Sequence, residues 1–150
     1  MNLVALEPRA AKLVVMITVR PAKFDDFPII AEFDEFLGDR RLDMQSGLKI
    51  VADLGEQTTV GYIRIGPSEL LGWPCLTALC VRSDCRRRGV GHELLVNAQA
   101  EERFTKLFTT TEQSNAPMHS LLSRVGARKV GEIDALNLND ETEMIYLLNP

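Results

Sequence analysis

Residues 81–91 carry the feature with the clearest chemical meaning, a basic and glycine-bearing turn between an apolar strand pattern and a helical pattern. The N-terminus of a helix has free backbone N–H groups and the positive end of the helix dipole, so it binds phosphate groups. Gly89 and Gly91 have no Cβ, so the backbone there can approach an anion closely. The arginines at 86–88 add charge-assisted hydrogen bonds. We therefore expect this turn to hold a pyrophosphate.

The turn differs from two well-known phosphate motifs. It lacks the Gly-x-Gly-x-x-Gly fingerprint of dinucleotide-binding folds and the Gly-Lys-Ser/Thr ending of a P-loop. A nucleotide-binding module is the weakest interpretation, since no acidic residue that could bind a ribose follows at the expected interval. A simpler alternative is that the arginine run is a solvated surface and the glycine pair only a turn.

Residues 86–91, Arg-Arg-Arg-Gly-Val-Gly, fit the pattern Arg/Gln-x-x-Gly-x-Gly/Ala. In this the chain resembles the GNAT superfamily of N-acetyltransferases, whose acyl-CoA signature has this pattern. Downstream, Ser114 and Asn115 precede a helical pattern that ends in Gly-Ala at 126–127, where the superfamily usually has Gly-Phe. The resemblance spans roughly residues 17–148 and implies acetyl-CoA as co-substrate. The cofactor-binding residues that it implies are Leu79, Cys80, Val81, Arg86, Arg87, Arg88, Gly89, Val90, Gly91 and Asn115.

By resemblance, we expect transfer of an acetyl group to a primary amine, by direct attack of the amine on the thioester in a ternary complex. The acceptor is a small-molecule or peptide amine, and the sequence does not separate the two. A non-catalytic acyl-CoA-binding or sensor domain on the same fold is the alternative from another functional class. We expect a cytoplasmic protein without nucleic-acid or membrane partners, with a homodimer left open.

The catalytic groups are less clearly marked. The superfamily often has a tyrosine four residues before the Gly of its Gly-Phe, as the acid that protonates the departing thiolate, but Leu122 stands at that position. Ser123 or a water molecule is the candidate substitute. An alkylammonium with a pKa of about 10.4 must lose a proton before it attacks, and a carboxylate normally assists. Glu112 is the candidate base, although a strand-end acid is more often a surface residue.

Cys80 lies within the implied cofactor segment, so a mechanism through an acyl-cysteine has to be considered. No histidine is evidently near enough in the sequence pattern to activate it, and a buried cysteine is a routine core residue. We therefore expect Cys80 to pack in the core and the transfer to be direct.

The acceptor pocket of this superfamily is usually bordered by the first two helices and by the strand that we expect at 58–65. Tyr62, Arg64 and Trp73 are the candidate acceptor-contacting residues. Residues 25–43 also hold seven acids against two arginines, and an acidic rim would attract a cationic amine. The alternative, which we favour, is a solvated polar helix face over a phenylalanine-rich inner face.

Hydrophobic patterning predicts an α/β (α+β) fold, with a mixed, mostly antiparallel sheet of about seven strands flanked by four helices, as in the GNAT superfamily. The expected helices cover residues 25–37, 40–48, 91–106 and 115–125. The expected strands cover residues 17–20, 49–54, 58–65, 75–81, 107–111, 127–133 and 143–148, with a loop at 67–72. The nearly continuous apolar run at 75–81 indicates a strand buried on both faces.

Length and composition argue against several other classes of protein. The 150 residues, 45% hydrophobic and 25% charged, suit one globular domain at 16–150 with a loose extension at 1–15. A net charge of −4 is unlike that of a general nucleic-acid binder, and the apolar run at 13–19 is too short to cross a membrane. Three cysteines without a Cys-x-x-Cys pair and only two histidines provide neither a disulfide framework nor a metal centre, which fits a reducing compartment.

Overall fold

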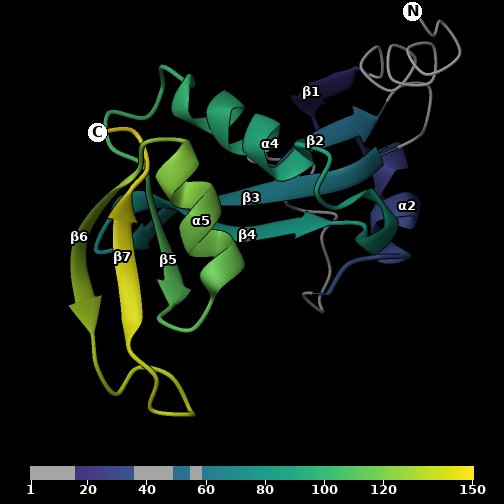
Figure 1. Ribbon diagram of the computed structural model, residues 1–150. Coiled ribbons are helices and arrows are strands. Elements are labelled where there is room, and N and C mark those ends of the chain that lie inside the picture. The colour runs from purple at the N-terminus through teal and green to yellow at the C-terminus, as the bar shows by residue number, and fades with distance from the viewer. Residues whose placement is uncertain (1–15, 36–48, 55–58) are drawn as a thin grey trace, which may run out of the picture.

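The computed structural model describes residues 16–35, 49–54 and 59–150 and places one mixed sheet at the centre of the molecule (Figure 1). Seven strands form this sheet in the order β1-β2-β3-β4-β5-β7-β6. In chain order the elements are β1 (Ile17–Pro21), η1 (Phe24–Asp26), α2 (Phe27–Ala31), β2 (Lys49–Leu54), β3 (Thr59–Leu70), β4 (Trp73–Val81), η2 (Ser83–Cys85), α4 (Val90–Gln99), β5 (Phe108–Glu112), α5 (Ala116–Arg124), β6 (Arg128–Ile133) and β7 (Glu143–Leu147), where η marks a short 3-10 helix.

Neighbouring strands run antiparallel except β4 and β5, which are parallel. α4 lies on the crossover between these two strands, as a parallel pair requires. The β3–β4 hairpin is tight, since Leu70 pairs with Trp73 across Leu71 and Gly72, whose φ values are 51° and 90°. Positive φ at both turn residues is the type I′ geometry that fits the twist of a hairpin. The expected mixed, mostly antiparallel sheet flanked by helices is confirmed.

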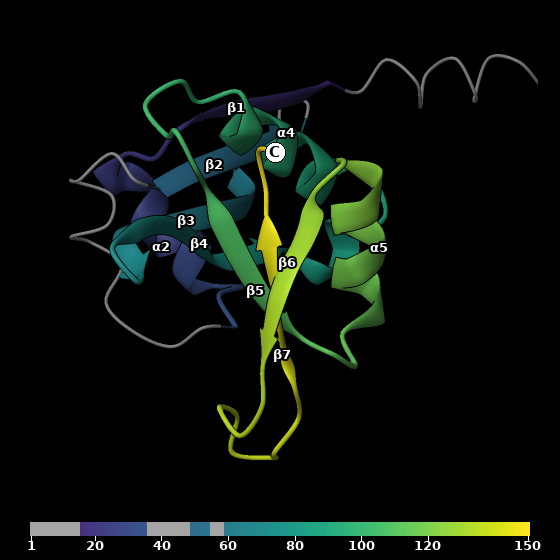
Figure 2. The same ribbon diagram turned by 90° about the vertical axis from the view of Figure 1, so that its left-hand side faces the viewer.

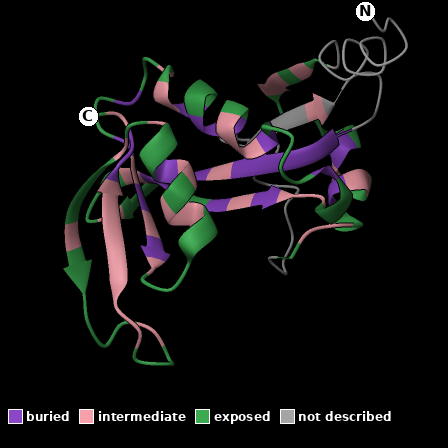
Figure 3. Ribbon diagram, in the orientation of Figure 1, coloured by how far each residue is buried: buried purple, intermediate pink, exposed green. Residues whose placement is uncertain are grey.

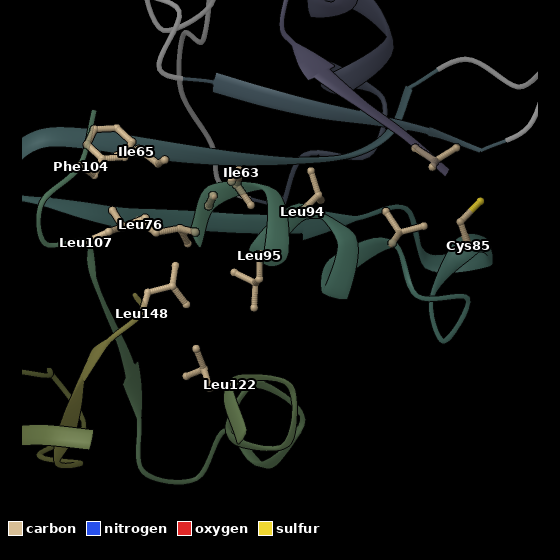
Figure 4. Packing of buried hydrophobic residues seen from close by; sticks show 13 residues of the cluster. Ile63, Ile65, Leu76, Cys85, Leu94, Leu95, Phe104, Leu107, Leu122 and Leu148 are labelled. Carbon is tan, nitrogen blue, oxygen red and sulfur yellow. The ribbon is translucent and has the colours of Figure 1, made fainter. Parts of the chain in front are cut away.

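Helices cover both faces of the sheet, with α4 and α5 on one face and α2 on the other (Figure 2). The larger core cluster lies under α4 and α5, and Figure 4 shows Leu95 and Leu122 pointing into it. The smaller cluster lies under α2 and includes Ile30 and Tyr62. Most of β3 and much of β4 are buried between these layers (Figure 3). The two clusters therefore hold the strands that border the site described below.

Local signals set the ends of the helices beside that site. α4 begins after Gly89, whose left-handed φ of 87° favours glycine. α5 begins after Asn115, whose side chain accepts a hydrogen bond from the Met118 N–H at 3.3 Å and so acts as an N-cap. Gly126, with a φ of 76°, follows the last residues of α5 and provides the left-handed turn that closes many helices.

Three expected segments differ in the structure. The helix expected at 91–106 ends at Gln99, because the chain then turns and inserts Phe104 and Leu107 into the core from a loop. The helix expected at 25–37 is divided into η1 and α2, and α2 ends at Ala31. The loop expected at 67–72 is largely strand, since β3 continues to Leu70 with a shift in register that hides the alternation of a regular strand.

The expected extension at 1–15 and the expected helix at 40–48 lie outside the described residues. Within the described residues the α-helices are α2, α4 and α5. The expectation of four flanking helices therefore stays a prediction for residues 40–48.

Candidate functional site

A cleft opens where β4 and β5 separate. These parallel neighbours are paired at Cys75–Phe108 and Leu76–Thr109, and both strands then continue without further pairing to each other. Two strands that diverge toward their carboxyl ends leave a crevice between them, and open sheets with parallel strands bind ligands in such crevices.

The free edge of β4 faces this crevice. The β3–β4 register shifts by one residue at Thr77, which forms a β-bulge just beyond the last β4–β5 pair. Further along, the Arg82 N–H donates to the Val60 carbonyl of β3 at 2.7 Å. Because peptide groups alternate in direction along an antiparallel pair, those of Leu79 and Val81 point away from β3 and toward the opening. A ligand in the crevice can therefore contact the main chain of both residues.

The turn after β4 has the shape of an anion site. Arg87 and Gly89 have left-handed φ values of 62° and 87°, and α4 begins directly after them. Turns of this kind gather backbone N–H groups on one side, and the first N–H groups of a helix have no partner within it. At Gly91, in the first turn of α4, an added Cβ would lie 3.2 Å from Cδ2 of Leu121. Gly89 thus provides the backbone angle, and the absence of a Cβ at Gly91 lets Leu121 of α5 lie close to the first turn of α4.

The cleft bounded by β4, this turn and α5 has a volume of about 850 Å³, which is within the size range of small-molecule sites. It is lined by every cofactor-binding residue predicted from the sequence except Arg88, which is exposed outside the lining. The predicted residues that line it are Leu79, Cys80, Val81, Arg86, Arg87, Gly89, Val90, Gly91 and Asn115.

Sequence reasoning missed most of the α5 wall. Pro117, Ser120, Leu121 and Arg124 line the cleft. Their spacing of i, i+3, i+4 and i+7 places them on one face of the helix. This spacing can be found in the sequence, but the four side chains are a mixture of apolar, hydroxyl and cationic groups, which is not the pattern of a core-facing helix. Asn115 lines the same wall, so it is both the N-cap of α5 and part of the site.

The cations of the cleft differ in their partners. Arg86 forms an ion pair with Glu35, and its Nε donates to the Val81 carbonyl at 3.0 Å. Arg87 and Arg124 also line the cleft, and neither pairs with a carboxylate in the part of the chain that the structure describes. These two guanidinium groups are therefore available to the oxygens of an anionic ligand.

The predicted catalytic residues do not line the cleft. Ser123 is exposed on another side of α5, whereas Ser120 lines the cleft. Leu122, at the position of the superfamily's tyrosine, is fully buried and points toward Leu95 and Leu148 (Figure 4). The structure therefore offers no proton donor at position 122.

Glu112 stands at the end of β5, directly opposite Glu143 of β7, and is half-buried. Thr109 and Thr111 are the buried residues of β5, and the Thr109 hydroxyl donates to the Leu76 carbonyl at 3.0 Å. Because side chains alternate along a strand, Glu112 lies on the face of the sheet opposite Thr111. Glu112 is therefore separated from the cofactor cleft by the strand itself.

Cys80 lines the cleft but is 3% exposed, and its Sγ donates to the Phe33 carbonyl at 3.6 Å. Burial raises the pKa of the Cys80 thiol, and the negative charges of Glu35 and Asp34 act in the same direction. Since the thiolate is the nucleophilic form, this environment disfavours an acyl-cysteine and agrees with the expected core role.

Two of the three predicted acceptor residues lie away from the cleft. Tyr62 is fully buried under α2, where its hydroxyl donates to Asp34 at 2.5 Å. Trp73 begins β4 at the far end of the strand, with the Lys106 ammonium 5.3 Å from the ring centroid. Tyr62 therefore packs in the core, whereas Trp73 is an exposed residue at the other end of β4.

Arg64 is the predicted acceptor residue that stands beside the opening. Its Nη1 donates to Thr77 at the bulge at 2.8 Å and pairs with Glu69 at 2.9 Å. Of the five acids of the 25–43 segment that the structure describes, three have close partners, and Asp25 and Glu32 are exposed. These partners are Arg20 for Asp26, Tyr62 for Asp34 and Arg86 for Glu35, while Asp39 and Asp43 lie outside the described residues.

The model of the acetyltransferase (GNAT) family matches residues 17–127, which include the turn after β4 and all of α5. The chain belongs to the GNAT acetyltransferase family. No protein with a curated description matches the chain in sequence.

Solved GNAT structures share this fold. A GNAT-family acetyltransferase from Bacillus cereus ATCC 10987 has a TM-score of 0.77 at 22% identity, covering 87% of this chain and 95% of its own. The diaminobutyrate acetyltransferase of Paenibacillus lautus, solved with L-2,4-diaminobutyric acid and coenzyme A, has a TM-score of 0.66 at 17% identity over 89% and 95% of the chains. The ribosomal-protein-S18-alanine N-acetyltransferase of Escherichia coli has a TM-score of 0.67 at 16% identity over 90% and 96%.

The cleft of this GNAT-family chain fits an acyl-CoA in its own geometry. The left-handed turn at Gly89 and the unpaired first N–H groups of α4 suit a diphosphate, and the edge of β4 that β5 leaves unpaired suits an extended amide chain. Among the residues that the structure describes, no helix has the length and apolar character to cross a membrane.

Proposed function

We propose that this GNAT-family protein transfers an acetyl group from acetyl-CoA to the primary amine of an acceptor. The proposal rests on one observation, the cleft that joins the β4 edge at Leu79 and Val81 to the N-terminus of α4. The helix N-terminus and Arg87 hold the diphosphate. The amides of the pantetheine arm pair with β4 in the way that an added strand pairs with a sheet edge.

In the proposed reaction the amine nitrogen attacks the thioester carbon, so that a C–N bond forms and the C–S bond breaks. The ammonium first loses a proton, and the departing thiolate gains one. Direct transfer is supported by the burial of Cys80, whose raised pKa disfavours a thiolate. We propose Ser120, or a water molecule beside it, as the proton donor in place of Ser123, because Ser120 is the serine that lines the cleft.

The acceptor is proposed to approach from the α2 face of the sheet. Arg64, Thr77 and Glu112 lie on that side of the opening, as the register and the alternation of β3, β4 and β5 indicate. Glu112 is proposed as the base that takes the proton of the ammonium, directly or through water. Small amines and peptide amines both remain acceptor candidates, since the two characterised neighbours above are named for one of each kind.

A non-catalytic acyl-CoA-binding domain is the second candidate. The observation in its favour is Leu122, a fully buried hydrocarbon side chain at the position where the superfamily often has its acid. The free, buried cysteines fit a reducing compartment for either function, so we propose a cytoplasmic protein.

The experiment is a thiol-release assay with acetyl-CoA over a panel of diamines, amino acids and peptides with free N-termini. The proposed function predicts acceptor-dependent release and an acetylated product of matching mass. Binding of acetyl-CoA without release from any acceptor would favour the non-catalytic candidate. Glu112→Gln should lower kcat most where the wild-type carboxylate is ionised, with little change in acetyl-CoA affinity, and an unaltered pH–rate profile would remove Glu112 from the mechanism. Glu132→Gln, on the exposed β6, is the matched control.

A further inference from the structure

α5 contributes a cation to the cleft wall that faces the α4 N-terminus. Arg124 lines the cleft on the same helix face as Leu121 and lies one turn further along the axis, which is about 4.5 Å. Leu121 is the residue of α5 that lies against Gly91, with 3.2 Å between its Cδ2 and a Cβ built on the glycine. Arg124 therefore stands one turn past this contact, on the side away from Asn115.

The charge of Arg124 is not used within the described structure. No carboxylate in the part of the chain that the structure describes pairs with it, and its side chain is exposed. Arg86 is different, because it already bonds Glu35 and the Val81 carbonyl. A guanidinium with a planar set of donors is well suited to a phosphate group. Since the proposed function assigns the diphosphate to the α4 N-terminus and Arg87, Arg124 is the cleft arginine left for a further anion of the ligand.

Coenzyme A carries such a second anion. Besides its diphosphate it has a phosphate monoester on the 3′ oxygen of the ribose, a dianion near neutral pH. We propose that Arg124 binds the 3′-phosphate of coenzyme A and makes the cleft select coenzyme A over 3′-dephospho-coenzyme A. This assignment rests on the proposed function, because it takes acyl-CoA as the ligand. It adds a specificity residue that lies outside the signature turn.

Calorimetric titration of the full chain with coenzyme A and with 3′-dephospho-coenzyme A tests the assignment without any acceptor. The wild-type protein should bind coenzyme A about tenfold more tightly, as one charge-assisted contact to a phosphate would give. Arg124→Gln should lose most of this preference for coenzyme A, while its affinity for the dephospho form stays within about twofold of the wild-type value. Arg124→Lys should keep part of the preference. Arg128→Gln, an exposed arginine of β6, should keep all of it.

The outcomes separate the two proposals. Failure of wild type to bind either ligand would contradict the proposed function itself. Tight binding of both ligands by wild type with no preference would overturn the Arg124 assignment and leave the proposed function intact. If Arg124→Gln lowered the affinity for both ligands equally, Arg124 would contact the diphosphate, and the assignment would likewise be overturned. Circular dichroism and melting of each variant show that the fold is retained.

Discussion

Gly91 and Leu121 lie against each other across the cleft, because a Cβ built on Gly91 would lie 3.2 Å from Cδ2 of Leu121. One residue belongs to the first turn of α4 and the other to the middle of α5. A bulky side chain at 91 would therefore either push α5 outward or fill the cleft beside the α4 N-terminus.

Gly91→Leu should weaken acetyl-CoA binding, because a branched side chain there would fill the cleft beside the first N–H groups of α4. Gly91→Ala is the milder variant and should bind acetyl-CoA nearly as the wild type does, since the acyl-CoA signature accepts Gly or Ala at this position. Isothermal titration measures both affinities. Gly131→Leu, on β6 outside the cleft, is the control. Wild-type affinity in Gly91→Leu would show that position 91 does not border the bound cofactor.

Gly89→Ala and Gly72→Ala separate backbone strain from ligand binding. Both glycines have a left-handed φ, 87° and 90°, so each substitution should cost about 1 kcal/mol of unfolding free energy. Gly72 lies in the β3–β4 turn, with nothing within 4 Å of an added Cβ. Denaturant titrations should therefore show similar losses, while only Gly89→Ala should weaken acetyl-CoA binding. Equal affinities in the two variants would contradict the role of the α4 N-terminus.

The cofactor half of the site could be predicted from sequence because it depends on local signals. Positive φ at Gly89, a helix start and a capping Asn115 are all properties of short segments. The catalytic half depends on distant parts of the chain. The orientation of α5 on the sheet decides which of its serines faces the cleft, and the packing of α2 decides that Tyr62 is buried.

The sequence also predicted too long a helix α4, which ends at Gln99. Phe104 keeps the helical spacing of apolar residues although it enters the core from a loop.

Ser120→Ala and Ser123→Ala form a matched pair on one helix. Ser120 lines the cleft, and Ser123 is exposed outside it. If Ser120 or its bound water protonates the thiolate, Ser120→Ala should lower kcat by about tenfold or more, as expected for loss of general acid assistance, and Ser123→Ala should leave it unchanged. Steady-state thiol release with the best acceptor of the panel measures this. The opposite ranking would restore Ser123 as the donor.

A part-buried ion cluster ties β1 to η1 and β2. Arg20 donates to both carboxylate oxygens of Asp26 at 2.8 Å and to Asp53 at 2.9 Å. Burial raises the pKa of Asp26, but the hydrogen bonds from Arg20 and the Lys23 N–H, together with the charge of Arg20, outweigh it and hold the pKa below the usual 3.8. A lowered pKa means that the ionised form stabilises the fold above pH 3.8, and that this stability is lost as the pH falls through the lower folded-state value.

Asp26→Asn should therefore lower the unfolding free energy by about 1–3 kcal/mol at pH 7, since it removes the charge of a carboxylate that pairs with the part-buried Arg20. The difference from wild type should shrink as the pH falls below about 4. Urea unfolding between pH 3 and pH 7 gives both results. Asp25→Asn, the exposed neighbour, is the control. A difference that does not depend on pH would mean that packing, and not charge, holds the cluster together.

The central claim is that the cleft between β4 and α5 binds acetyl-CoA, and thermal unfolding with and without that ligand tests it most directly. A ligand at about 100 times its Kd adds about 2.7 kcal/mol to a folded state that alone binds it. For a domain of this size we expect a rise in Tm of several degrees with acetyl-CoA and a much smaller one with ATP or NAD. An unchanged Tm at saturating acetyl-CoA would contradict the cofactor site, and with it the proposed acetyl transfer.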